Sequence, residues 1–384
     1  MKLTEEQQRI SSLARDFSRR ELAPHAARWD REASFPTAAV KQMAKIGLLG
    51  MTAPAEFGGS GVDAVSLAIA IEEVARGDAS TALVLSMANS LSILTLMTYG
   101  TPTQRSQWLP QIVSGDCIAC FTLTEPQAGS DPTAIKTTAR RNGERYILRG
   151  AKQFISLGSV SKLAFVFALT DPTAAAKGIS CFLVPTDSKG FSVVRKEDKM
   201  GLRASDTCQI AFDDVELAPE QMLGALGDGY RIALHGLAAS RIGVAAQAVG
   251  VAAAALAEAS GYARQRASFG RHLVEHQAIG FRLADMATQT QAARLLVRHA
   301  ANLKDRGEPY AVASSMAKVY AAEMCERVCS GAIQVLGGIG YMKDSPVERW
   351  YRDARVFQIY EGTNEVQRMI ISRAIARDRL PETL

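Results

Sequence analysis

The sequence predicts a multidomain α+β protein: an all-α N-terminal domain, a middle β-barrel or β-sandwich domain, and a C-terminal four-helix bundle. Its 384 residues are enough for two or three domains with a sizeable core. Apolar residues recur at helical spacing in the first and last parts of the chain, whereas in the middle they alternate over short runs. Strands and helices do not alternate, and no GxGxxG motif follows a predicted strand, so a Rossmann domain is not expected.

The first predicted domain, residues 1–116, is helical. Thr4 and Gln7 stand in a capping-box arrangement with Leu3 as a hydrophobic staple, which predicts the start of the first helix. Residues 80–97 form the longest apolar stretch, but serine and asparagine interrupt it, so we expect a buried helix rather than a membrane span. Further helices are expected around residues 38–45, 63–76 and 103–113.

The second predicted domain, residues 117–226, is built of strands. The pair Asn142-Gly143 lies between two alternating runs, which is a strong signal for a β-hairpin. Several short strands at close spacing favour a small barrel or sandwich. The strand-like runs cover residues 117–124, 136–150, 162–170, 179–186, 191–196 and 207–217.

The third predicted domain, residues 227–384, is helical again. Alanine-rich segments at 229–264, 276–305 and 310–336, with a last helix from Asn364, have the lengths of a four-helix bundle.

Composition excludes several classes of protein. The formal net charge of +5 is mild and the basic residues are scattered, so nucleic acid is not an expected partner. The six cysteines and the lack of an apolar run at the N-terminus predict a cytoplasmic protein with buried, unreactive thiols. Cys117 and Cys120 form a solitary CxxC in a predicted strand, which is poor geometry for a shared metal, so no metal site is predicted.

The stretch IYEGTNEVQR places an isolated carboxylate, Glu361, directly before a predicted helix. Thr363 or Asn364 could cap that helix, and Gln367 would complete a capping box with Asn364. Gly362 permits a sharp bend or the close approach of a ligand. On local grounds alone, Glu361 would only complement the helix dipole.

Five stretches together resemble the acyl-CoA dehydrogenase family, and the resemblance runs nearly from end to end. They are CFTLTEPQAGSD (120–131), KMGLRASDT (199–207), RASFG with HLVEHQA (266–278), QVLGGIGY (334–341) and IYEGTNEVQR (359–368). The family has the same order of helical, β and four-helix-bundle domains. The resemblance implies oxidation of a saturated acyl-CoA to the trans-2-enoyl-CoA, with FAD as the cofactor.

The resemblance also implies which residues contact FAD. A loop rich in hydroxyls and free amides suits a flavin ring, and arginine suits a pyrophosphate. Taken singly, the same features also fit an ordinary strand end, a solvated arginine or a helix C-cap. The family often has tryptophan at the position of Phe154. The implied FAD contacts are Phe121, Leu123, Thr124, Gly129 and Ser130; Phe154, Ile155 and Ser156; Arg266, Phe269 and Gln277; Gln334, Val335, Leu336, Gly337 and Gly338 across a subunit boundary; and Thr363, Asn364 and Glu365.

Glu361 matches the base that removes the α-proton of the substrate in this family. In another branch of the family the base occupies the position of Ser240 instead. Many relatives have an aspartate where Ala238 stands, so a polar contact from Ala238 is not expected. The implied substrate contacts are Ser130, Leu237, Ser240, Arg241, Tyr360 and Gly362.

The leading hypothesis is a dehydrogenase for short or branched acyl chains, assembled as a homotetramer and passing electrons to an electron-transfer flavoprotein. One alternative is a flavin oxidase on the same fold; a glutamate at position 361 argues against the monooxygenases of this fold. A second alternative is a non-catalytic binding protein that kept the scaffold. Insertion into a membrane is not expected.

Overall fold

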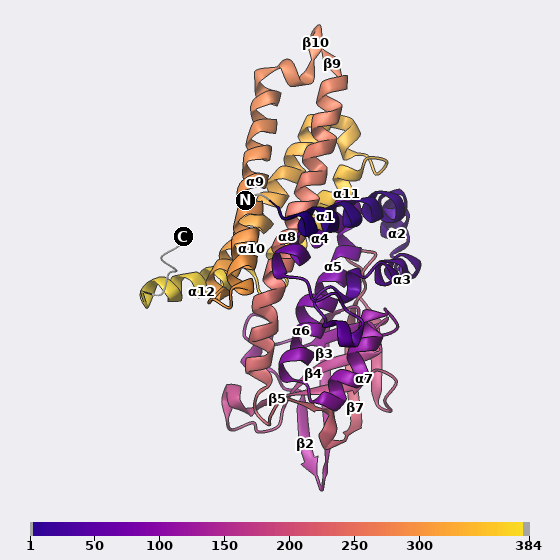
Figure 1. Ribbon diagram of the computed structural model, residues 1–384, viewed down its shortest axis with the longest axis vertical. Helices are drawn as coiled ribbons and strands as arrows, with labels where there is room; N and C mark the ends of the chain where they lie inside the picture. The colour runs from indigo at the N-terminus through magenta and orange to yellow at the C-terminus, as the bar shows by residue number, and fades with distance from the viewer. Residues whose placement is uncertain (1–2, 379–384) are drawn as a thin grey trace.

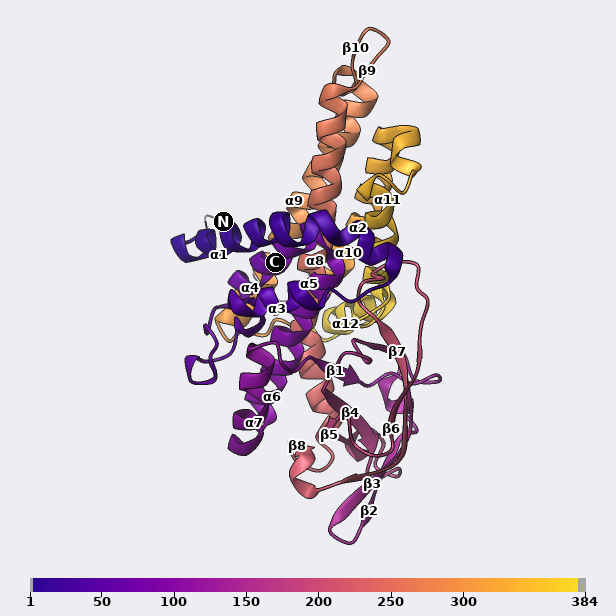
Figure 2. The same ribbon diagram turned by 90° about the vertical axis from the view of Figure 1, so that its right-hand side faces the viewer.

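The structure is a computed structural model that describes residues 3–378. The long helices of the C-terminal domain form a column, the N-terminal helices pack against its middle, and the β domain lies at its lower end (Figures 1 and 2). The predicted order of domains is confirmed.

The N-terminal domain contains the predicted helices together with one that was not predicted, α2. The capping box of Thr4 and Gln7 is present at the start of α1. The predicted helix over residues 80–97 is interrupted by a π-helical segment, Met87–Ile93. The helices are α1 (Glu5–Phe17), α2 (Ala23–Glu32), α3 (Thr37–Lys45), α4 (Ala64–Gly77), α5 (Ala79–Ser86), α6 (Leu94–Tyr99) and α7 (Pro102–Val113).

The middle domain holds one sheet in the order β6-β7-β3-β2-β4-β5-β8, with β1 parallel to β4. The Asn142-Gly143 hairpin forms as predicted, since Asn142 pairs with Arg145. All six predicted strand runs are found. The strands are β1 (Ala119–Thr122), β2 (Thr138–Asn142), β3 (Arg145–Ser156), β4 (Leu163–Leu169), β5 (Ile179–Pro185), β6 (Phe191–Lys196), β7 (Thr207–Leu217) and β8 (Met222–Leu223).

Strand β4 is buried on both faces, which explains its uninterrupted apolar sequence. Phe165 and Phe167 face a core shared with Ile112 of α7 and residues of α8. The alternate residues, such as Val166, face a second core with Ile210 of β7. The sheet therefore folds over a core of its own while its other face packs on the helices.

The C-terminal domain is built around three long helices, α8 (Gly229–Gln265), α9 (Gln277–Asp305) and α10 (Ala311–Leu336), with α12 (Asn364–Ala376) as the fourth helix. The short hairpin β9 (Ala267–Ser268) and β10 (Arg271–His272) joins α8 to α9 at the upper end of the column (Figure 1). Helix α11 (Pro346–Ala354) was not predicted.

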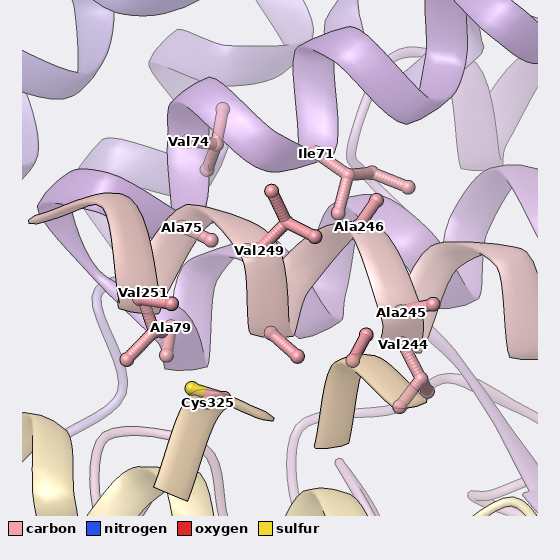
Figure 3. Close-up of a cluster of buried hydrophobic side chains, with 14 of the residues drawn as sticks. Ile71, Val74, Ala75, Ala79, Val244, Ala245, Ala246, Val249, Val251 and Cys325 are labelled. Atoms are coloured by element: carbon pink, nitrogen blue, oxygen red, sulfur yellow. The ribbon is translucent and has the colours of Figure 1, made fainter. Parts of the chain in front are cut away.

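Helices α4 and α8 cross at small residues. A Cβ atom on Gly250 would lie 2.2 Å from the carbonyl oxygen of Glu72, so only glycine permits this approach. Ile71, Val74 and Ala75 of α4 pack here against Val249 and neighbouring residues of α8 (Figure 3). This contact fixes α8, which carries several of the predicted site residues, against the N-terminal domain.

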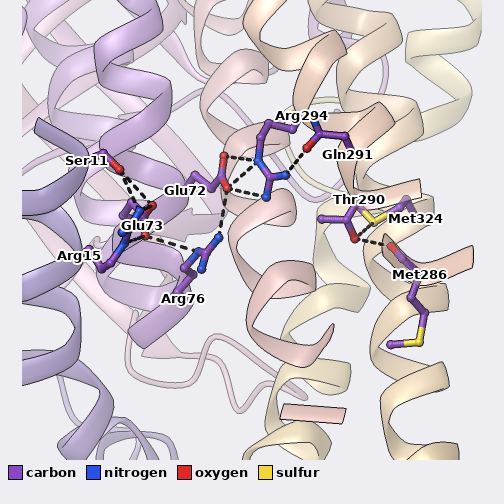
Figure 4. Close-up of polar contacts among 10 residues, drawn as sticks. All are labelled: Ser11, Arg15, Glu72, Glu73, Arg76, Met286, Thr290, Gln291, Arg294 and Met324. Atoms are coloured by element: carbon purple, nitrogen blue, oxygen red, sulfur yellow. Dashed lines mark hydrogen bonds and ion pairs between the residues drawn. The ribbon is translucent and has the colours of Figure 1, made fainter. Parts of the chain in front are cut away.

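Charged side chains join α4 to two other helices, α1 and α9 (Figure 4). Glu73 of α4 binds Arg15 of α1 at 2.7 Å, and Glu72 binds Arg294 of α9 at 2.8 Å. The network thus joins the N-terminal domain to the bundle.

Among residues 3–378, two helical segments are long and apolar enough to cross a membrane by composition alone: Ala79–Tyr99 and Gly229–Gln265. In each, 78% of the most apolar window is buried inside the fold, which is the pattern of a core helix. All six cysteines are buried and unpaired, as predicted, and burial raises the pKa of the Cys117 thiol to about 11.

Candidate active site

Glu361 lies in a strained turn immediately before α12. Its φ is 57° and that of Gly362 is 86°, so both residues are in the left-handed region. That region costs a residue with a side chain about 1–2 kcal/mol, and such strain gathers at functional sites. Glycine suits the positive φ of position 362, and a Cβ atom there would also displace Gln367 Nε2, which lies 2.7 Å away.

Three side chains hold the carbonyl groups of this turn. Arg241 Nε and Gln367 Nε2 each donate to the Glu361 carbonyl at 3.3 Å, and Gln367 Nε2 also lies 2.8 Å from the Gly362 carbonyl. Lys318 Nζ donates to the Gly362 carbonyl at 2.8 Å and to Asn364 Oδ1 at 2.9 Å. The turn is therefore fixed from α8, α10 and α12 together.

Glu361 as a whole is half-buried, and its carboxylate accepts a hydrogen bond from Ser240 Oγ at 2.5 Å. Burial raises the pKa of the carboxyl group, since desolvation disfavours the charged form. The Ser240 hydroxyl and the charges of Arg241 and Lys318 oppose this rise. The result is a carboxylate that is more basic than usual and therefore better suited to proton abstraction near neutral pH.

Lys318 was not predicted as a site residue. Its side chain is fully buried in α10, and burial lowers the pKa of its ammonium to about 7. An intrinsically helical, alanine-rich segment gives no sign that one lysine points inward, so the sequence offered little signal.

Tyr360 turns toward the bundle core. Its hydroxyl donates to Gln247 Oε1 at 2.7 Å, and Gln247 Nε2 donates to the Ala79 carbonyl at 2.6 Å. Tyr360 was predicted to contact the substrate. Its hydroxyl is instead hydrogen-bonded to Gln247 of the same protein.

Thr363 caps α12, because its side chain accepts from the Val366 amide at 3.3 Å. The alternative capping box of Asn364 and Gln367 is wrong: Asn364 is the first helical residue and is buried, and Gln367 bonds instead to the Glu361 turn. Of the predicted FAD contacts here, Glu365 is exposed, whereas the Asn364 side chain binds Lys318 and Glu323.

A buried ion pair fixes the predicted flavin-binding loop of the β domain. Lys152 Nζ lies 2.8 Å from Glu125 Oε1 and 3.1 Å from the Leu123 carbonyl, and both side chains are almost completely buried. The Gln153 amide donates to the Thr124 carbonyl at 3.0 Å, so the end of β1 is bound to β3. Neither Lys152 nor Glu125 was predicted as a site residue, although Glu125 lies in the CFTLTEPQAGSD motif and Lys152 lies two residues before Phe154.

Phe154 leaves the regular path of β3. The β3–β7 register shifts between Lys152 and Ile155, and the φ of Phe154 is 58°, as in a β-bulge. The Phe154 ring is 59% exposed as a result. Ile155, also a predicted FAD contact, has its side chain buried in the β core, whereas Ser156 is half-buried.

Leu237, Ser240 and Arg241 lie on one side of α8, as their spacing of three and four residues requires. Phe121 approaches the same helix, since a Cβ atom on Gly236 would lie 4.0 Å from its ring. The structure therefore brings the end of β1, the middle of α8 and the Glu361 turn to one region. Ser130 lies on the exposed loop after β1.

A second group of predicted FAD contacts lies at the other end of the column. Arg266, Phe269 and Gln277 surround the β9–β10 hairpin, and Phe269 is 95% exposed (Figure 1). The last turns of α10 lie beside the first part of α9, because Gly331 of α10 faces Met286 of α9. Within a single chain, these residues are not brought to the Glu361 turn.

Residues 334–338 at the end of α10 belong to the same group. Gln334, Gly337 and Gly338 are exposed, whereas the side chains of Val335 and Leu336 are buried in the core of their own chain. Val335 and Leu336 could therefore contact a cofactor only through their backbone.

The residues around β1 and β3 fit a flavin. Thr124 and Ser156 are half-buried, so each hydroxyl is partly open to a ligand. Apart from sequence neighbours, no atom of residues 3–378 lies within 4 Å of a Cβ position on Gly129, Gly337 or Gly338, so a ligand can approach the backbone there. Partly exposed hydroxyls beside open backbone match the many donors and acceptors of an isoalloxazine ring and a pyrophosphate.

Comparison with known proteins places these features in one class. Models of the N-terminal, middle and C-terminal domains of acyl-CoA dehydrogenases match residues 4–116, 120–215 and 227–376. The chain belongs to the acyl-CoA dehydrogenase family, which confirms the predicted fold, the FAD cofactor and a flavin-dependent oxidoreductase acting on a CH–CH bond.

Individual relatives are similar over almost their whole length. The mitochondrial short-chain specific acyl-CoA dehydrogenase of Rattus norvegicus is 44% identical over 98% of this chain and 92% of its own. Butyryl-CoA dehydrogenase from Megasphaera elsdenii has a TM-score of 0.96 at 41% identity, covering 98% of this chain and all of that one. A chain from a study of the electron transferring flavoprotein of Acidaminococcus fermentans has a TM-score of 0.97 at 42% identity, with 98% and 100% coverage.

Proposed function

We propose that this protein is a short-chain acyl-CoA dehydrogenase in which Glu361 is the catalytic base. The observation that carries the proposal is the Glu361 carboxylate itself: it is desolvated, it is held in a left-handed turn, and it faces Ser240 of α8. A strained, well-supported carboxylate of raised basicity suits the removal of a weakly acidic proton.

In this proposal Glu361 removes the proton α to the thioester carbonyl. When bound, FAD supplies the acceptor for the hydride that leaves the β-carbon. The developing negative charge on the thioester oxygen needs a donor, and the Glu361 amide has no acceptor within residues 3–378. Removal of one such donor typically costs about 2.7–4 kcal/mol of transition-state stabilisation.

The substrate class rests on the relatives, which are named as short-chain and butyryl-CoA dehydrogenases. The earlier hypothesis also included branched chains. An anaerobic titration with acyl-CoAs of different length and branching tests this: straight chains of about four carbons should bleach the flavin fastest, and a preference for branched or long chains would contradict the assignment.

The substitution Glu361→Gln tests the base. It keeps the size of the side chain and removes its basic oxygen, so flavin reduction should slow by about 10²–10⁴-fold while acyl-CoA still binds. Glu258→Gln makes the same chemical change on an exposed part of α8 and should leave the rate unchanged. Flavin reduction by Glu361→Gln at nearly the original rate would show that another group is the base.

We further propose an electron-transfer flavoprotein as the electron acceptor, with support from the similarity to a chain studied with such a protein. Turnover with a ferricenium dye should far exceed peroxide production. Peroxide as the main product would instead favour the oxidase alternative, and purified protein that binds no flavin would favour the non-catalytic one.

The proposed assembly is a homotetramer with FAD at a subunit boundary. Support comes from the distance between the two groups of predicted FAD contacts and from the exposure of Phe269. Sedimentation at micromolar concentration should give about four chains, and a monomer holding full flavin would contradict this. The unpaired, buried cysteines support a cytoplasmic location.

A further inference from the structure

Ser240 stands between two hydrogen-bond acceptors. It is buried on α8, and its Oγ lies 2.5 Å from Glu361 Oε2 and 3.1 Å from the Leu237 carbonyl. A serine hydroxyl has one proton to donate and two lone pairs to accept with. Only one of the two bonds can therefore be donated by Ser240 at a given moment.

This geometry suits both protonation states of Glu361. When the carboxylate is ionised, Ser240 donates to it. When Glu361 carries a proton, its hydroxyl donates to Ser240 Oγ, and the Ser240 hydrogen turns to the Leu237 carbonyl. A rotation of one hydroxyl thus leaves every group bonded before and after proton transfer, with no movement of the helix.

No other neighbour can respond in this way. Arginine and lysine donate only, and Arg241 and Lys318 are directed to backbone or amide oxygens of the turn. The Tyr360 hydroxyl is bonded to Gln247. Within residues 3–378, Ser240 is the one side chain that hydrogen-bonds the Glu361 carboxylate.

We propose that Ser240 is a positioning residue for the reaction: a reversible donor and acceptor that holds the Glu361 carboxyl group in both states and sets how readily it ionises. This inference rests on the proposed role of Glu361 as base. The sequence had placed Ser240 among the substrate contacts. In the step itself, the substrate Cα–H bond breaks, its electron pair stays on the substrate, and the proton bonds to Glu361; Ser240 exchanges no proton and only reorients.

The loss of this hydroxyl should make Glu361 harder to ionise. The bond from Ser240 is the largest of the interactions that favour the charged carboxylate, ahead of Arg241 of α8 and Lys318 of α10. Two further carboxylates, Glu323 and Glu365, interact with the Lys318 ammonium and raise its pKa. Tyr360, whose own pKa is raised, is the other titratable group beside Glu361. Lys318 titrates near neutrality and must be separated from Glu361 in any pH profile.

The experiment compares Ser240→Ala with Ser240→Thr in the FAD-loaded enzyme. Anaerobic stopped-flow reduction by butyryl-CoA is followed from about pH 5.5 to 9, with flavin absorbance confirming that each variant is loaded. Ser240→Thr keeps the hydroxyl and the surroundings of Lys318, so it is the matched control.

For Ser240→Ala we expect the apparent pKa of flavin reduction to rise by about one unit, which is a tenfold loss of rate on the acidic limb. The rate at high pH and the Kd for butyryl-CoA should stay within about threefold. Ser240→Thr, which keeps the hydroxyl, should keep the original apparent pKa.

A purely structural or substrate-binding role would lower the high-pH rate or weaken butyryl-CoA binding without moving the pKa, and that result would overturn the inference. An equal shift in Ser240→Thr would overturn it too, since the hydroxyl would not be responsible. Failure of the base assignment is separate: it would appear as a fast Glu361→Gln enzyme.

Discussion

The two groups of predicted FAD and substrate residues differ in how the chain supports them. Around the Glu361 turn, polar groups are tied to one another by buried side chains from three helices. Around the β9–β10 hairpin, Phe269 is 95% exposed and Arg266 and Gln277 face solvent. The chain alone thus builds the turn that carries the proposed base, whereas the residues around the hairpin offer contacts that a cofactor or another subunit would have to complete.

Like the Glu361 turn, the loop after β1 is held by buried polar groups, and the largest loss of stability is expected from removing one partner of its ion pair. Lys152→Met leaves the Glu125 carboxylate buried without its cation, and such a loss typically costs about 3–5 kcal/mol in the free energy of unfolding. Urea denaturation of the apoprotein measures it.

Arg149→Met is the matched control on the same strand, β3. Arg149 pairs with Asp214, and both side chains are about half exposed or more, at 67% and 49%. An exposed pair contributes about 0–1 kcal/mol. Equal losses in the two variants would contradict the view that the Lys152–Glu125 pair anchors the loop.

A smaller effect is expected from Gly362→Ala. The alanine would take an unfavourable positive φ of 86° and approach Gln367 Nε2, so unfolding should become easier by about 1–3 kcal/mol and flavin reduction should slow. Gly261→Ala is the control, because that helical glycine has no neighbour within 4 Å of the new Cβ, and it should stabilise by about 0.5–1 kcal/mol. A neutral Gly362→Ala would mean that the turn is not strained.

The sequence predicted the features that depend on local chemistry. The Thr4 cap, the Asn142-Gly143 hairpin and the Thr363 cap are set by neighbouring residues and were found where expected, although Asn364 had been an equal candidate. The missed helices α2 and α11 both have proline in the first turn, a start signal that was available.

What the sequence could not predict depends on distant parts of the chain. Lys152 of β3 pairs with Glu125 in the loop after β1, and Lys318 of α10 bonds to the Gly362 carbonyl and to Asn364 at the start of α12. The positive φ of Glu361 and Phe154 is unfavourable locally and persists because surrounding contacts impose it. The motifs were enough to predict Glu361 as a site residue. The side chains that hold it, such as Lys318, could be identified only from the three-dimensional structure.

The smallest change in stability is expected from Phe269→Ala. This substitution also tests the residues around the β9–β10 hairpin most directly. Because the ring is exposed, its loss should change the free energy of unfolding of the apoprotein by no more than about 0.5 kcal/mol. If the ring contacts FAD or another subunit in the assembled enzyme, the same substitution should weaken FAD retention severalfold during gel filtration and lower the fraction of tetramer.

Leu226→Ala, which removes an exposed side chain near the start of α8, should affect neither FAD retention nor the fraction of tetramer. The contrast between an unchanged apoprotein and a weakened holoenzyme is the expected signature of a contact made outside the single chain. Unchanged FAD retention would remove Phe269 from the predicted contacts, and a large loss of apoprotein stability would show that the hairpin is supported by its own chain after all.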